Sequence, residues 1–288
     1  MLNRKELRDS IYSKINELPT LPAVVPKLME LTESRESSAR DVTRVIENDP
    51  ALTAKILRVA NSAYYGFSGR IEVLGMAVPL LGFNMVRSLA ISISVMQSLP
   101  EGKGSRYFTE AGLWLHSLGV AAVMKELGTG VKKGEDTEYL FIIGLLHDIG
   151  KIVLDQYFHD TFQDVLEEAN SGNNARLYLV EREKFGIDHC EISAMLLERW
   201  KFPEKIVSVI ASMHKESQKK DSVDTALLRV SNVLSQELNL GSEGNMYPGI
   251  VNGKDLEILG IDEDELELMR SKLEPLRGAI GSFYSSLA

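Results

Sequence analysis

The apolar residues of this chain recur at helical spacing in short segments, and glycine, proline or asparagine separates one segment from the next. After Pro22, for example, Val24, Val25, Leu28 and Leu31 fall on one face of a helix. No convincing segment shows the two-residue alternation of a half-buried strand. Leu, Ile, Val and Ala are abundant, whereas aromatic residues make up only 7% of the chain. The sequence therefore predicts an all-α fold.

Helix-start signals divide the first hundred residues. Ser37 or Ser38 is expected to cap one helix, and Asp49 to cap the next, with Pro50 at its first position. A strongly apolar helix is predicted from about 84 to 99. Two helical subdomains are expected, because the stretch 100–104 holds a proline and two glycines that cannot continue this helix.

Beyond this break, the pattern predicts a helical bundle. The predicted helices cover residues 107–127, 135–154, 156–170, 175–185, 188–200, 203–214 and 222–238. The glycine-rich stretch 239–253 is expected to be a long loop, and a final helix is predicted over about 262–280. The predicted division is an N-terminal subdomain over 1–104, the bundle over 105–240, and a loop and helix packing on the bundle over 241–288.

Charge and cysteine content restrict the partners and the compartment. The chain has 32 Lys and Arg against 41 Asp and Glu, a net charge of −9, and no dense basic stripe, which argues against nucleic acid as a partner. A single cysteine excludes an internal disulfide framework. There is no apolar signal-peptide core, and no apolar run approaches the ~18 residues of a membrane span. We therefore expect a cytoplasmic protein with no membrane partner.

The chain has five histidines, and four of them fall on predicted helices of the second half: His116, His147, His189 and His214. A single histidine is more often a hydrogen-bonded or surface residue than a metal ligand. The His147-Asp148 pair differs, because it follows an apolar run from Leu140 to Leu146 and would be costly to bury without partners. Imidazole and carboxylate groups bind divalent first-row metals. The fifth histidine, His159, lies in a polar stretch and is expected at the surface.

Two sets of motifs resemble known families. The string Gly144-Leu-Leu-His-Asp-Ile-Gly-Lys151 resembles the signature of HD-superfamily phosphohydrolases. The N-terminal half resembles the HDOD (HD-related output domain) family through its Leu18–Pro22, Ile46–Leu57, Asn61-Ser62 and Leu81-Gly82 motifs. Downstream, Phe185–Glu191 and Leu197–Pro203 continue the match, so that the resemblance covers about residues 15 to 240.

The resemblance implies a set of site residues in an HD-like helical bundle. His116, His147 and Asp148 would hold a divalent metal (Fe, Mn, Zn or Mg), but Asn232 stands where the motif has a second aspartate. A neutral amide is a weaker ligand and cannot act as a base. His189 and His214 match positions that hold additional metal in the related HD-GYP phosphodiesterases. Lys151 would contact a substrate phosphate, or is a solvated lysine at a helix end.

The resemblance also implies a regulatory or output role in bacterial signal transduction, with signalling proteins as partners in trans and a nucleotide as a candidate ligand. Asn232 and the missing Gly-Tyr-Pro element favour a non-catalytic module, with or without a bound metal. The alternative is a metal-dependent phosphohydrolase acting on a nucleotide or cyclic dinucleotide, with Asp148 and Lys151 as catalytic residues. A third interpretation, a helical scaffold without a site, gives no reason for the histidine–aspartate cluster.

Overall fold

The computed structural model describes residues 3–33, 38–67, 70–133, 137–172, 176–241 and 243–287. Throughout this described part, the backbone forms helices joined by turns and loops, and the one β-type contact is an isolated antiparallel bridge between Phe108 and Glu243. The all-α prediction is confirmed. The chain forms two compact units, Met1–Leu18 with Pro100–Glu274 (unit 1) and Pro19–Leu99 with Pro275–Ala288 (unit 2).

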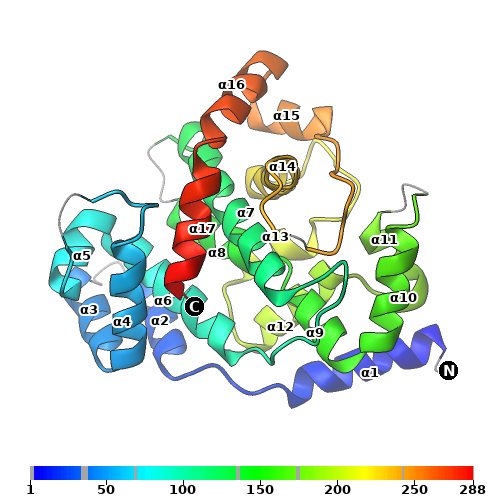
Figure 1. Cartoon of the computed structure of the whole chain (residues 1–288), viewed down its shortest axis with the longest axis horizontal. Coiled ribbons are helices and arrows are strands. Elements are labelled where there is room, and N and C mark those ends of the chain that lie inside the picture. The colour runs from blue at the N-terminus through cyan, green and yellow to red at the C-terminus, as the bar shows by residue number, and fades with distance from the viewer. Residues whose placement is uncertain are drawn as a thin grey trace. The chain divides into compact units, whose positions relative to one another are not determined.

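Unit 2 is built around one buried helix. Its elements are α2 (Val24–Glu33), α3 (Ala39–Glu47), α4 (Pro50–Ala60), α5 (Leu74–Leu81), α6 (Phe83–Ser98) and α17 (Leu276–Leu287) (Figure 1). All α6 residues from 85 to 95 are buried. The predicted caps are present: the Ser38 side chain caps α3, and Asp49 Oδ1 accepts a hydrogen bond from Leu52 N at 3.0 Å. Ser37, the alternative cap, lies outside the described residues.

Unit 1 holds the remaining helices (Figure 1). They are α1 (Arg4–Glu17), α7 (Glu110–Val131), α8 (Glu138–Leu146), α9 (Gly150–Tyr157), α10 (His159–Ala169), α11 (Leu177–Lys184), α12 (His189–Arg199), α13 (Glu204–Ala211), α14 (Val223–Glu237), α15 (Gly253–Leu259) and α16 (Glu263–Leu273). The long helix α7 packs against both α8 and α14. Every residue of α7 from Gly112 to Met124 except Leu115 is buried, so α7 is the central element of this unit.

Several elements differ from the predicted ones. The predicted helix 262–280 is two helices, because Pro275 has no N–H to donate to the preceding turn and α16 ends before it. Helices α1 and α15 are not among the predicted elements, although Asn3 and Glu6 form a capping box at the start of α1. The predicted helix starts at residues 135 and 175 lie outside the described residues.

The two units also do not follow the predicted division at the chain ends. Helix α1 belongs to unit 1, where Ile11 and Ile15 are buried and Arg199 donates a hydrogen bond to Asn16 O at 2.9 Å. Helix α17 belongs to unit 2 and not to the bundle, because it packs on α4, where Arg58 Nε donates to Ser286 O at 3.2 Å. Each unit is thus made from two separate stretches of chain.

No single helix among the described residues is both long and apolar enough to cross a membrane. Helices α5 and α6 reach the required length and apolarity only when taken together, and they are bent by 114° with respect to each other.

Candidate metal centre

The His147-Asp148 pair lies in a turn, not within a helix as predicted. Helix α8 ends at Leu146, and α9 begins at Gly150. A side chain at Gly150 would place its Cβ 2.1 Å from His189 O, so only glycine lets the turn approach α12 this closely. Because the helix is broken here, both side chains of the pair point into the same buried space. His147 is 0% exposed and Asp148 is 2% exposed.

The His147 ring has a defined orientation. Its Nδ1 lies 2.7 Å from Gly144 O, which fixes the proton on Nδ1 and leaves Nε2 free. This Nε2 lies 3.2 Å from Asp148 Oδ1. Burial lowers the pKa of His147 to about 4, and the charges of His116 and Lys151 act in the same direction while Asp148 opposes them. His147 is therefore a neutral imidazole near pH 7, as metal binding requires.

Helices α7 and α14 bring two further predicted residues to this point. His116 Nε2 lies 3.9 Å from Asp148 Oδ2 and 2.9 Å from Asn232 Oδ1. One ligand atom from each of His116, His147 and Asp148 lies within 4.8 Å of the other two. Residues that are far apart in the sequence thus converge, as the resemblance implied.

Two buried atoms of this group are poorly satisfied: His147 Nε2 has no hydrogen-bond partner, and Asp148 Oδ1 has only a 3.2 Å contact with His189 Nε2 besides the one with His147. Leaving such groups unsatisfied costs about 1–3 kcal/mol each, more for a charged one. Both are electron-pair donors that face each other, which is the environment that a divalent cation satisfies. The donor set therefore fits a metal ion held by His116, His147 and Asp148, with His116 exchanging its hydrogen bond to Asn232 for the ion.

Lys151 is buried, which contradicts its interpretation as a solvated helix-end lysine. Its side chain is 3% exposed, and Nζ lies 2.6 Å from Asp148 Oδ2 and 2.7 Å from Glu243 Oε2. Gln236 Nε2 donates to the other Glu243 oxygen at 2.7 Å. Burial lowers the pKa of Lys151, but the Asp148 and Glu243 carboxylates outweigh it and raise the pKa above its usual range. The lysine is a permanent cation within the site.

His189, the first residue of α12, adds a third imidazole. Its Nε2 lies 3.2 Å from Asp148 Oδ1, and its Nδ1 lies 2.5 Å from the buried carboxylate of Glu181. Burial opposes a charge on His189, but the Glu181 carboxylate outweighs it and raises the pKa well above its usual value.

His214 follows α13 and lies apart from the His116–His147–Asp148 group. Its Nδ1 is 3.3 Å from Asp188 Oδ2, and it gathers instead with His189 and Cys190. Burial lowers the pKa of His214, but Cys190 and Asp188 outweigh it and raise the pKa to about 9. His159 lies outside both groups, paired with Asp155 Oδ1 at 2.9 Å, and its side chain is 23% exposed, which is less than a surface position would give.

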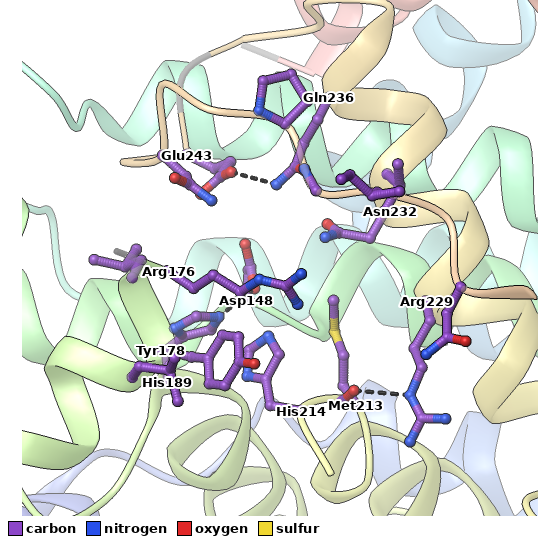
Figure 2. Close-up of a pocket in the computed structure, with 18 of the residues that line it drawn as sticks. Asp148, Arg176, Tyr178, His189, Met213, His214, Arg229, Asn232, Gln236 and Glu243 are labelled. Carbon is purple, nitrogen blue, oxygen red and sulfur yellow. Dashed lines mark hydrogen bonds and ion pairs between the residues drawn. The ribbon is translucent and has the colours of Figure 1, made fainter. Parts of the chain in front are cut away.

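Several of these side chains line a cavity of about 840 Å³ in unit 1, namely Asp148, Lys151, His189, His214, Asn232 and Glu243. In Figure 2, Asn232, Gln236 and Glu243 lie on one side of this pocket, and Tyr178, His189 and His214 lie on the other. Arg176 and Lys215 also line it, as do Tyr247 and Ile250 from the loop after α14. The volume is within the range of small-molecule sites.

Sequence reasoning missed three carboxylates of the site, Glu181, Asp188 and Glu243. The position of Asp188 could have been predicted, because Asp188 and Glu191 have the spacing of a capping box and form one at the start of α12. Glu181 and Glu243 gave none, because nothing in helical periodicity shows that a carboxylate on α11 or in a loop will meet a buried histidine or lysine.

A family model described as the HDOD domain matches residues 18–216. The chain belongs to the HDOD family. A curated relative from Treponema pallidum (strain Nichols), described as an uncharacterized protein, is 25% identical over 212 residues. The match covers 73% of this chain but only 40% of that relative.

Two solved structures share the fold of this HDOD chain. A candidate phosphohydrolase from Shewanella amazonensis SB2B is 26% identical, with a TM-score of 0.77, and the match covers 97% of this chain and 98% of that one. A candidate signal transduction protein from Marinobacter aquaeolei VT8 is 23% identical, with a TM-score of 0.83, over 99% of this chain and 66% of that one. At this identity, the second likeness shows the fold alone.

Proposed function

We propose that this HDOD chain is a regulatory output module of bacterial signal transduction, whose pocket binds a ligand without hydrolysing it. The supporting observation is that the buried carboxylates lining the pocket are held in ion pairs. Lys151 binds both Asp148 and Glu243, and Asp255 pairs with Arg229 at 3.1 Å. A general base must be free to take a proton from the attacking water. A carboxylate held by a buried cation is a poor base.

Asn232 supports the same proposal. Its amide oxygen is hydrogen-bonded to His116 Nε2 at 2.9 Å. An amide cannot accept a proton near neutral pH, so this position supplies no base. A protein that binds a ligand and signals to partners in trans needs the pocket but not the base.

A nucleotide is the ligand class that we propose. Arg176 and Lys215 line the pocket and are available to an anionic group, because no described residue forms an ion pair with either of them. The pocket is large enough for a ligand of this size.

A binding and turnover assay with the full chain tests this proposal. Nucleotides and cyclic dinucleotides are screened by calorimetry and, with Mn²⁺ or Fe²⁺ added, by product analysis. We expect one ligand to bind, with turnover no higher than in Asp148→Ala. Arg176→Ala should weaken binding, whereas Lys219→Ala, an exposed lysine outside the pocket, should not. Hydrolysis that Asp148→Ala abolishes would contradict the non-catalytic assignment.

A metal-dependent phosphohydrolase is the second candidate function. It is favoured by the unpartnered His147 Nε2, which faces the Asp148 carboxylate, and by the likeness to a candidate phosphohydrolase at 26% identity. His116, His147 and Asp148 would hold the ion. Such an ion lowers the pKa of a bound water towards ~7 and polarises a phosphoryl oxygen.

Elemental analysis of the Mn²⁺-loaded and desalted protein tests the ligand set. We expect one equivalent of metal in the wild type and none in His147→Ala. His159→Ala is the matched control, since this histidine lies outside the group on the same unit, and it should keep its metal. Equal metal content in all three proteins would rule out these ligands, whichever function holds.

A further inference from the structure

A second group of donor atoms lies beside the first, and it is richer in sulfur. Ligand atoms of His189, Cys190 and His214 lie within 4.8 Å of one another. The Cys190 thiol donates to Met213 Sδ, with 3.5 Å between the two sulfur atoms. The group therefore offers two imidazoles, one thiol and one thioether. Cys190 is 1% exposed and Met213 is 5% exposed.

Each imidazole ring of this group is oriented by a buried carboxylate at its Nδ1. Glu181 Oε2 lies at His189 Nδ1, and Asp188 Oδ2 lies 3.3 Å from His214 Nδ1; both acids are fully buried. A carboxylate on one ring nitrogen orients the ring and makes the other nitrogen a better ligand. Asp188 Oδ2 also contacts Arg182 Nη2 at 2.6 Å, whereas buried His214 Nδ1 lacks a well-formed hydrogen bond.

The donor types differ between the two groups. Imidazole and carboxylate from His116, His147 and Asp148 suit Mn²⁺, Fe²⁺ or Zn²⁺, whereas thiolate and thioether sulfur select the softer cuprous ion. A thioether in particular adds little for Mg²⁺ or Mn²⁺. The turn between α13 and α14 supplies Met213 and His214, and the start of α12 supplies His189 and Cys190.

We propose that these four side chains form a binding site for Cu⁺, beside the His116–His147–Asp148 group. The proposal goes beyond the proposed function and does not depend on it. Met213 and His214 line the 840 Å³ pocket, which gives the ion a path to the buried sulfur atoms. When they bind the ion, the Cys190 thiol and the protonated His189 and His214 rings each release one proton to solvent. His189 belongs to both groups through its 3.2 Å contact with Asp148 Oδ1.

Anaerobic Cu⁺ competition with the full, reduced chain tests the site. The protein is titrated against bicinchoninate, and the copper is examined by X-ray absorption. We expect one equivalent of Cu⁺ to leave the chelator and two sulfur neighbours to appear around the copper. Because Cys190 is the only cysteine, any thiolate signal belongs to it. Cys190→Ala should weaken Cu⁺ binding by about 100-fold or more, by analogy with the 10–100-fold losses from weaker outer contacts.

Two variants keep the test decisive. Met213→Leu should bind Cu⁺ more weakly and leave one sulfur neighbour in place of two, which holds even where Cys190→Ala fails to fold. Met124→Leu is the control, because Met124 is a buried methionine of α7 outside the group, and it should bind like the wild type. The proposal is overturned if the wild type takes no Cu⁺ from the chelator, or if Met213→Leu keeps wild-type affinity and both sulfur neighbours.

Discussion

The ammonium group of Lys151 is the central charge of the buried site. Two carboxylates, Asp148 and Glu243, lie within 2.7 Å of it, and all three side chains are 4% exposed or less. Burying two carboxylates together without a cation would be costly, because water can no longer solvate them. We therefore expect the lysine to stabilise the pocket whether or not a metal is bound.

Lys151→Met tests this charge balance. The variant keeps most of the length of the side chain but removes the cation that Asp148 and Glu243 share. We expect a loss of about 3–5 kcal/mol in the free energy of unfolding of the metal-free protein, measured by urea denaturation. Added Mn²⁺ should restore part of this loss, because an ion at Asp148 supplies positive charge.

Lys219→Met is the matched control. Lys219 pairs with Glu257 at 2.7 Å, but its side chain is 80% exposed, so its loss should cost no more than about 1 kcal/mol. Equal stability of Lys151→Met and the wild type would show that Asp148 and Glu243 are not charged together in the metal-free protein.

The contrast between Lys151 and His147 shows how far the sequence could predict the site. His147 and Asp148 stood out because polar residues directly followed an apolar run, and a buried position was the physical consequence. For Lys151, the sequence leaves both interpretations open, a lysine that contacts a substrate phosphate and a solvated lysine at a helix end. The residue that decides between them, Glu243, is 92 residues away in the chain. Periodicity gives the face of a helix, but it does not give the partner from a distant loop.

At the scale of elements, glycine allows α8 to pack closely on α7. A Cβ at Gly144 would lie 2.5 Å from Ala121 Cα and 2.6 Å from Ala121 N, both backbone atoms that cannot move aside. Gly144 O also accepts the hydrogen bond that orients the His147 ring. The sequence predicted one helix over 135–154, because the apolar pattern continues through residues 147–149 and the turn there depends on these tertiary contacts.

Gly144→Ala and Gly130→Ala form a matched pair on these helices. Gly144→Ala should destabilise unit 1 by about 3 kcal/mol or more, because α8 must move away from α7, and it should also lower metal binding through His147. Gly130, on α7, has nothing within 4 Å of its added Cβ. Its change to alanine should stabilise the protein by about 0.4–1 kcal/mol. Thermal unfolding and metal content of both variants check the pair, and equal effects would contradict close packing at Gly144.

At the scale of the whole molecule, the chain passes between its two units three times, each time at a proline. The steps are Leu18-Pro19, Leu99-Pro100 and Glu274-Pro275. Proline cannot continue a helix, and it favours an extended conformation in the residue before it. Leu18 and Leu99 are both extended, with ψ angles of 147° and 146°. The break at 100–104 was therefore visible in the sequence. The assignment of α1 to unit 1 and of α17 to unit 2 depends on packing, so the sequence did not show it.

Phe283→Ala tests whether each unit depends on its own core. Phe283 is 2% exposed, and its ring contacts Tyr64 edge-on at 5.4 Å, so α17 fills part of the unit 2 core. We expect the variant to lose about 3–5 kcal/mol, with unit 2 unfolding in an earlier transition of its own. Metal content should stay at the wild-type value below that transition and fall only in a second one, because His147 and Asp148 belong to unit 1. Ser285→Ala, at an exposed position of the same helix, should change stability by less than about 0.5 kcal/mol. A single transition in which metal and helicity are lost together would show that the two cores are one cooperative structure.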